Sequence, residues 1–219
     1  MPHAPFDQLA DEYDAWYDEN RGAFRAELFA LEHAIPDAFD PGSDRALEVG
    51  VGTGRFADGL GIPVGVDPAR NSLELARERG IDPVRGVAES LPITTDAIDL
   101  AVVVTALAFV DDLEATLEEL RRVLTPDGAL VVAVLDRESP LGASYEDRKE
   151  ASPFYADADF LSGEATCAAL ESAGFTIEVR LQTIFDDPAD LETNPVKSAE
   201  VREGHGDGLF AVVRARPAE

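Results

Sequence analysis

The stretch ALEVGVGTGRFADGL, residues Ala46–Leu60, joins an apolar run to a segment that can form a helix. Glycine occupies alternate positions within it, at Gly50, Gly52 and Gly54. Because glycine has no Cβ and tolerates positive φ angles, a turn built from it lets the backbone approach a ligand closely. A first strand that ends in such a turn and opens a helix is typical of nucleotide-binding α/β sheets. The stretch therefore predicts a nucleotide-like ligand at the carboxyl end of the first strand.

The rest of the chain places this turn in a larger pattern. Strand-like apolar runs alternate with amphipathic segments after residue 44, which is typical of a doubly wound α/β sheet. The last two runs are predicted to form an antiparallel pair, residues 6–35 are expected to be helical, and residues 137–160 are expected to be irregular. The predicted strands are Arg45–Gly50, Ile62–Asp67, Pro83–Ala88, Ala97–Leu107, Ala129–Asp136, Thr176–Phe185 and Gly208–Pro217, and the predicted later helices are Ala69–Gly80, Asp111–Leu124 and Ser162–Gly174.

The length of 219 residues is compatible with one domain and a substantial core. We expect a single domain over residues 1–219. Its parts would be a helical cap over 1–40, a cofactor-binding core over 44–136, and a substrate-side segment with the C-terminal strands over 137–219.

The net charge is −26, from 44 acidic and 18 basic residues. The acids are scattered along the chain, which predicts an acidic, solvated surface. This charge argues against a nucleic-acid substrate, because phosphate binding needs clustered Lys and Arg. Self-repulsion of such a surface is relieved when salt screens it, so we hypothesise a salt-adapted protein from a halophile.

The sequence shows no sign of a membrane span, a secretory signal, an internal disulfide or a metal site. The longest apolar stretch, which starts at Leu100, is too short to span a bilayer, and the N-terminal segment carries acids where a secretory signal carries bases. A single cysteine, Cys167, cannot form an internal disulfide. His3, His33 and His205 are far apart, and no metal-binding spacing occurs. We expect a cytoplasmic protein with no metal.

Two ligand classes compete for the glycine turn. A dinucleotide site needs G-x-G-x-x-G/A followed by an acid about 20 residues later. Here the sixth position is Arg55, and Asp67 follows Gly54 by 13 residues. Arg55 would crowd a pyrophosphate, and Glu48 would repel it. A nucleoside that carries a cationic group fits better, with Asp67 accepting hydrogen bonds from both ribose hydroxyls.

A family resemblance is carried by five segments, which follow one another along the chain. They are EVGVGTGRFA, GVDPARNSLELARERG, VRGVAESLP, DAIDLAVVVTALAFVDD and LEELRRVLTPDGALVVAVLD. The chain resembles the class I S-adenosylmethionine-dependent methyltransferases, and most closely their type 11 group, which includes quinone-biosynthesis enzymes. The resemblance covers Ala46–Asp136 and extends to YDAWY, Tyr13–Tyr17. It implies a Rossmann-like, seven-stranded mixed sheet whose last strand is antiparallel, and S-adenosylmethionine as the cofactor.

The resemblance also implies a role for individual residues. The three glycines would line the methionine and ribose, Asp67 would bind the ribose hydroxyls, and the aromatic cap segment would cover the cofactor. For Glu89 a solvated loop position is an alternative to a contact with the adenine amine. The implied cofactor-binding set is Tyr13, Trp16, Glu48, Gly50, Gly52, Gly54, Asp67, Pro68, Ala88, Glu89, Thr105 and Ala106.

Methyl transfer from a sulfonium is an in-line displacement in which the protein mainly aligns the acceptor. A base is needed only if the acceptor must lose a proton. Candidates on the acceptor side are Asp136, Tyr155 and His205. For Asp136 the alternative is a surface ion pair, and for His205 it is a solvated loop position. The predicted function is methylation of a small-molecule acceptor. The alternatives are a non-catalytic S-adenosylmethionine-binding regulator and a nicotinamide-dependent oxidoreductase.

Overall fold

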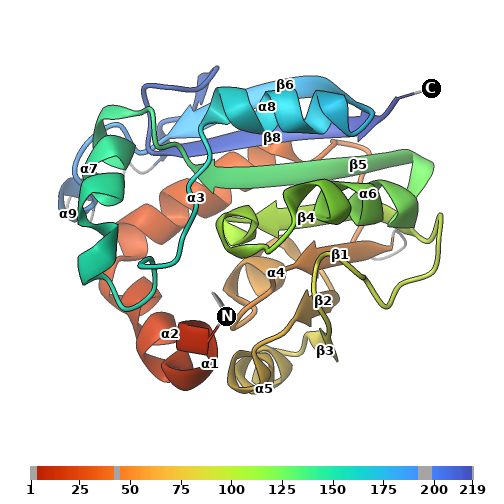
Figure 1. The fold of residues 1–219 in the computed structure, drawn as a ribbon, viewed down its shortest axis with the longest axis horizontal. Coiled ribbons are helices and arrows are strands. Elements are labelled where there is room, and N and C mark those ends of the chain that lie inside the picture. The colour runs from red at the N-terminus through yellow and green to blue at the C-terminus, as the bar shows by residue number, and fades with distance from the viewer. Residues whose placement is uncertain (1–3, 42–44, 192–198, 219) are drawn as a thin grey trace.

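The computed structural model describes residues 4–41, 45–191 and 199–218. One mixed β-sheet organises them, with strands in the order β3-β2-β1-β4-β5-β8-β6-β7 (Figure 1). The pairs among β1 to β5 are parallel, whereas β8 runs antiparallel to both β5 and β6. The strands are β1 Ala46–Val49, β2 Val64–Asp67, β3 Asp82–Arg85, β4 Ile98–Val104, β5 Leu124–Leu135, β6 Phe175–Thr183, β7 Arg202–Glu203 and β8 Phe210–Pro217.

This sheet confirms the predicted mixed α/β class and the antiparallel last strand. It differs from the expected seven strands by β7, a two-residue strand at the sheet edge that pairs with Leu181 and Gln182 of β6. So short a strand carries no alternating apolar pattern, which is why the sequence did not indicate it. β4 is also shorter than predicted, because the chain turns at Thr105 into a 3-10 helix, η1 Ala106–Phe109.

The predicted N-terminal helical stretch is divided into three helices, α1 Ala4–Gln8, α2 Ala10–Glu19 and α3 Arg21–Ala34. The breaks fall at Leu9 and Asn20, whose backbones leave the helical region. The remaining helices are α4 Arg55–Leu60, α5 Arg70–Glu78, α6 Leu113–Val123, α7 Pro140–Arg148, α8 Gly163–Ser172 and α9 Pro188–Leu191, with a second 3-10 helix, η2 Lys149–Ala151.

The expectation of an irregular segment over 137–160 was wrong for its central part, which forms α7. The Ser139 hydroxyl accepts a hydrogen bond from the Gly142 N–H at 3.0 Å, and Pro140 stands in the first turn. A serine cap followed by proline is a helix-start signal, because proline has no N–H to leave unpaired there. The polar composition of the segment masked this signal.

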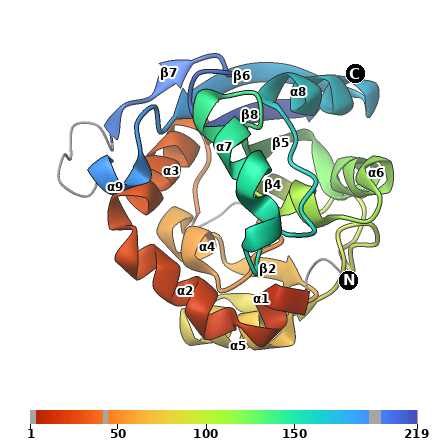
Figure 2. The same cartoon turned by 60° about the vertical axis from the view of Figure 1, so that its left-hand side comes forward.

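The core lies on both faces of the sheet. Along β4, Leu100, Val102 and Val104 face the side covered by α3, α4 and α5, while Ala101 and Val103 face the side covered by α6 and α8. Burial on both faces explains why this strand reads as a continuous apolar run. The cap and α7 lie over the edge of the sheet where the parallel strands have their carboxyl ends (Figures 1 and 2).

Within the described ranges, no helix is both long enough and apolar enough to cross a bilayer. In the same residues, no three His, Cys, Asp or Glu side chains gather as a metal site would require.

Candidate active site

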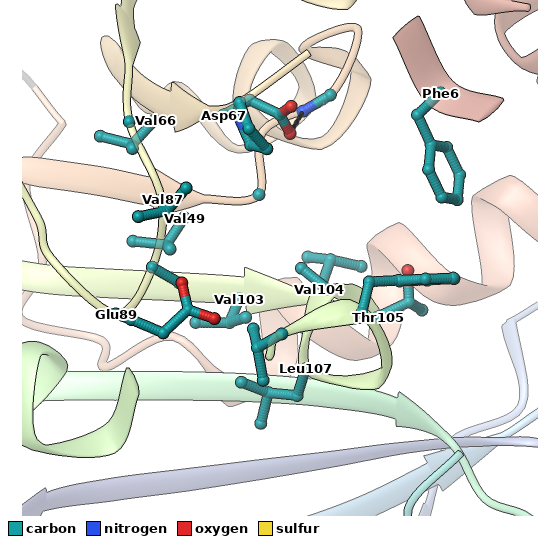
Figure 3. A pocket seen from close by; sticks show the side chains of 18 of the residues that line it. Phe6, Val49, Val66, Asp67, Val87, Glu89, Val103, Val104, Thr105 and Leu107 are labelled. Carbon is teal, nitrogen blue, oxygen red and sulfur yellow. Dashed lines mark hydrogen bonds between the residues drawn. The ribbon is translucent and has the colours of Figure 1, made fainter. Parts of the chain in front are cut away.

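A cavity of about 200 Å³ opens at the carboxyl ends of β1, β2 and β4, and we call it the glycine-turn cavity. Figure 3 shows its apolar wall, formed by Val49, Val66, Val87 and Val103, between the carboxylates of Asp67 and Glu89. Most of the predicted cofactor-binding residues border it: Tyr13, Gly50, Gly52, Asp67, Pro68, Ala88, Glu89, Thr105 and Ala106.

The three glycines of the turn serve different purposes. All have positive φ, at 76°, 51° and 83° for Gly50, Gly52 and Gly54. A Cβ on Gly50 would collide with the Ala106 side chain, and one on Gly54 would come within 3.0 Å of Ala76 in α5. Of the three, only Gly52 faces open space where a Cβ would be. Gly54 is therefore required for packing of the turn against α5, whereas Gly52 is the glycine that leaves room beside the cavity.

Asp67 is held in place by the glycine turn. Its Oδ2 accepts a hydrogen bond from the Gly52 N–H at 2.9 Å, and its Oδ1 accepts one from the Ala69 N–H at 2.8 Å. These bonds fix the orientation of a buried carboxylate at the end of β2, on the wall of the cavity. A carboxylate oxygen can accept more than one hydrogen bond, so this anchoring is compatible with contact to a ligand's hydroxyls.

Glu89 borders the cavity and also organises its rim. Its Oε1 accepts a hydrogen bond from the Asp111 N–H at 2.7 Å. This bond ties the loop after β3 to the segment that leads into α6. Thr105, directly after β4, has a φ of 54°, a strained value for a residue with a β-branched side chain, and such strain clusters at functional sites.

Glu48 does not line the glycine-turn cavity. Its side chain is 1% exposed, and it borders a small neighbouring space together with Gly52 and Arg55. Its Oε2 has no hydrogen-bond partner among the described residues. Burial, together with the negative charge of Asp67, raises the pKa of Glu48 well above its usual range.

A second cavity of about 150 Å³ lies next to the first, and we call it the aromatic cavity. The two share Tyr13, Thr105 and Tyr155, so these three residues form the boundary between them. Trp16, predicted to contact the cofactor, borders this second cavity instead. Its other lining residues are Tyr17, Ala23, Glu27, Phe56, Leu135, Tyr145, Ser152, Phe154, Ile184, Pro188 and Leu209.

Aromatic contacts hold the cap over both cavities. The hydroxyls of Tyr13 and Tyr17 lie 2.8 Å apart, and the Tyr13 ring packs edge-on against Phe6 with centroids 5.0 Å apart. Tyr13 also contacts Phe154, which follows α7. Burial raises the pKa of Tyr13 to about 12, so its hydroxyl is neutral at physiological pH. The cap thus packs against the junction of the two cavities.

An ion-pair network fastens the cap to the turn. The Arg55 guanidinium lies 2.7 Å from Asp14 and 2.9 Å from Asp18, and Arg79 also reaches Asp14 at 2.7 Å. Burial opposes ionisation of Asp14, but hydrogen bonds from Arg55, Thr53 and Arg79 outweigh it and lower the pKa to about 2. The arginine at the start of α4 therefore positions the cap.

The three acceptor-side candidates separate in space. Tyr155 borders both cavities, but Asp136 and His205 border neither. Asp136 is fully buried and accepts hydrogen bonds from the Glu138 N–H at 3.0 Å and the Gly206 N–H at 3.1 Å, so it ties the end of β5 to the loop before β8. His205 lies 3.4 Å from the Glu164 carboxylate, away from both cavities.

The sequence reasoning missed Phe6 and above all Glu27 as cavity residues. A signal for Glu27 was present, because it shares the helical face of Ala23, Ala26 and Ala30, which is otherwise apolar. An acid on the buried face of an amphipathic helix needs an explanation, since carboxylates are seldom fully buried without a partner.

Comparisons with known proteins agree with this geometry. Residues 47–132 match the family described as methyltransferase domain. An uncharacterized protein of Methanocaldococcus jannaschii is 38% identical over 96% of this chain and 97% of its own length. A Haloferax volcanii protein, solved in complex with the Trm112 methyltransferase activator, is 21% identical over 95% of this chain and 97% of that one, with a TM-score of 0.68, which shows the fold alone.

A Thermotoga maritima protein of known structure resembles the whole chain, and it is described as an S-adenosylmethionine-dependent methyltransferase, possible histamine N-methyltransferase. The TM-score is 0.91 and the sequence identity 39%, over 98% of this chain and 99% of that one. Similarity of this degree over nearly all of both chains, with the glycine turn and its acid in place, shows that the chain belongs to the S-adenosylmethionine-dependent methyltransferases.

Proposed function

We propose that this methyltransferase binds S-adenosylmethionine in the glycine-turn cavity and a small-molecule acceptor in the aromatic cavity. The observation that carries the proposal is the contact between the two cavities at Tyr13, Thr105 and Tyr155. A methyl donor on one side of this boundary and an acceptor on the other are placed for in-line transfer. Membership of the family leaves no support for the nicotinamide-dependent alternative.

The residues of the glycine-turn cavity fit the donor chemically. Asp67, fixed by two backbone N–H groups, would accept from the ribose hydroxyls. The open space at Gly52 would admit the ribose and the amino-acid part, and the valine wall would pack against the adenine near Ala88 and Glu89. Thr105 and Ala106 would lie beside the methionine part at the boundary. The unpartnered oxygen of Glu48 lies in the neighbouring space, where a cationic ligand would favour the ionised form of this carboxyl group.

S-adenosylmethionine supplies a methyl group on a positively charged sulfur. The task of the chain is to bind both molecules, orient the acceptor atom and exclude water. Orientation alone can lower a barrier by about 7–11 kcal/mol in favourable cases. Tyr155 and Tyr13, both half-buried, would shape the path between the cavities. The Thermotoga relative's description names an amine as a possible acceptor, so amines are the first acceptors to screen.

The test is a pair of measurements on the purified chain. Calorimetric titration should show binding of S-adenosylmethionine and S-adenosylhomocysteine but not of NAD. A screen of small-molecule acceptors should then show release of S-adenosylhomocysteine. Binding of NAD in preference to the methyl donor would refute the proposal, as would methyl transfer to protein or nucleic acid with no small molecule accepted.

A further inference from the structure

The aromatic cavity contains a carboxyl group that the fold does not satisfy. Glu27 lies in the middle of α3, its side chain is 7% exposed, and the exposed part faces this cavity. Within the described part of the chain, neither a hydrogen-bond donor nor a cationic side chain reaches its carboxyl group. Burial alone accounts for the rise in its pKa. Burying an unpaired carboxylate costs free energy that the fold does not recover. A partner outside the chain would remove that cost.

The surroundings of Glu27 specify the chemistry of this partner. Tyr13, Trp16, Tyr17, Tyr145 and Tyr155 border the same cavity, and the faces of aromatic rings attract cations. No Lys, Arg or His lines the cavity among the described residues. An ammonium group fits such a cavity, because it would pair with the carboxylate and contact the faces of the aromatic rings. A carboxylate or phosphate ligand would find no cation in this cavity, and a neutral phenol or quinone would leave the charge of an ionised Glu27 uncompensated.

We propose that the methyl acceptor is an amine, and that its ammonium form binds between the Glu27 carboxylate and the tyrosine and tryptophan rings of the aromatic cavity. This inference rests on the proposed function for the assignment of that cavity to the acceptor. It adds the class of acceptor and the residue that selects it.

Proton linkage gives the proposal a distinctive readout. Burial raises the pKa of Glu27 to about 8. The titratable groups that face it are Tyr13, Tyr17, Tyr145 and Tyr155, and burial raises the pKa of each, so none carries charge near neutrality. The charge of Arg148 lowers the pKa of Tyr145 and that of Asp187 raises it, both by less than burial does. At pH 7 most Glu27 carboxyls are therefore protonated, and an ammonium ligand that needs the carboxylate must drive this proton into solvent.

The experiment uses 2-phenylethylamine as the probe and 2-phenylethanol as its neutral counterpart of the same shape. Trp16 is the only tryptophan in the chain and borders the cavity, so its fluorescence reports binding there. Titrations are run on the full chain with and without S-adenosylhomocysteine. Glu27→Gln tests the carboxylate, and Glu32→Gln, at an exposed position of the same helix, is the matched control.

We expect the amine to bind at least about tenfold more tightly than the alcohol, a difference that Glu27→Gln abolishes and Glu32→Gln leaves intact. Calorimetry at pH 7 in buffers of different ionisation enthalpy should show release of about 0.9 proton per amine bound, and none in Glu27→Gln. Between pH 6 and 7 the amine's Kd should fall about tenfold.

Equal affinity for amine and alcohol, no binding of the amine at millimolar concentration, or an amine affinity unchanged by Glu27→Gln would each overturn the inference. Binding of S-adenosylmethionine is measured on every variant. If the wild-type chain does not bind S-adenosylmethionine, the proposed function is refuted. The amine titration tests the ammonium site independently of that result.

Discussion

Replacing Asp67 tests the donor site at the residue on which most of its geometry depends. The carboxylate stands at the end of β2 and accepts hydrogen bonds from the Gly52 and Ala69 N–H groups. Charge-assisted hydrogen bonds contribute about 1.5–3 kcal/mol each, and about 1.4 kcal/mol corresponds to a factor of ten in Kd. If Asp67 holds the ribose, Asp67→Ala should weaken S-adenosylmethionine binding by at least about tenfold.

The same two backbone donors decide how this experiment must be controlled. Asp67→Ala leaves both N–H groups without their acceptor, and a buried unpaired donor costs about 1–3 kcal/mol. Asp67→Asn keeps one acceptor oxygen and should disturb the fold less, while it still loses the charge. Asp58→Ala, at an exposed acid of α4, controls for the change in net charge.

Calorimetric Kd values for S-adenosylmethionine are measured beside thermal unfolding on the three variants. We expect Asp67→Asn to lie between wild type and Asp67→Ala in affinity, and Asp58→Ala to match wild type. A folded Asp67→Ala whose Kd stays within about twofold of wild type would refute the assignment of Asp67 to the ribose, because no charge-assisted bond is that weak.

Other expectations follow from the same contacts. Gly50→Ala should lower the free energy of unfolding in urea by about 1–3 kcal/mol, and by more than Gly52→Ala, because only the former drives a Cβ into Ala106; an equal loss would contradict this. The pKa of Asp14 is lowered to about 2 from 3.8, so its ion pairs stabilise the cap above pH 3.8 and are lost as the pH falls through 2. Asp14→Asn should therefore cost about 1–2 kcal/mol at pH 7 and little below pH 2, which chemical unfolding at both pH values checks. With a net charge of −26, the melting temperature should rise between 0.1 M and 2 M KCl, and a salt-independent value would argue against halophilic adaptation. Finally, Glu27→Gln should raise the melting temperature in the absence of ligand, most strongly above pH 8 where the carboxylate is ionised, whereas a lower melting temperature would indicate that Glu27 stabilises the fold.

The parallel half of the sheet could be predicted from the sequence because its central strands, β1 and β4, are buried on both faces. The run from Leu100 to Val104 needs no tertiary information to be recognised, since only a covered strand tolerates it. The glycine-turn cavity could be predicted for a related reason: turns at the carboxyl ends of neighbouring parallel strands lie side by side, which brings Asp67 near Gly52.

The acceptor side could not be predicted in this way. Its walls come from α2, α3 and the residues around Tyr145 and Tyr155, and their meeting depends on how the cap docks through Arg55 and Asp14. No local pattern encodes that contact. The same limit applied to Gly54. The motif predicted this residue beside the ligand, whereas the structure places it against Ala76. A glycine motif does not distinguish a close approach to a ligand from a close approach to a helix.

The placement of buried acids links the two cavities. Glu48 beside the glycine-turn cavity and Glu27 in the aromatic cavity are both buried with a raised pKa, and no arginine contributes to either shift. On the proposed function, each cavity receives a cation: a sulfonium in one, an ammonium in the other. Two cations brought together in a poorly screened interior repel each other strongly. A carboxylate beside each would offset that repulsion, so that the free energy lost in burying the two acids would be recovered when both ligands are bound.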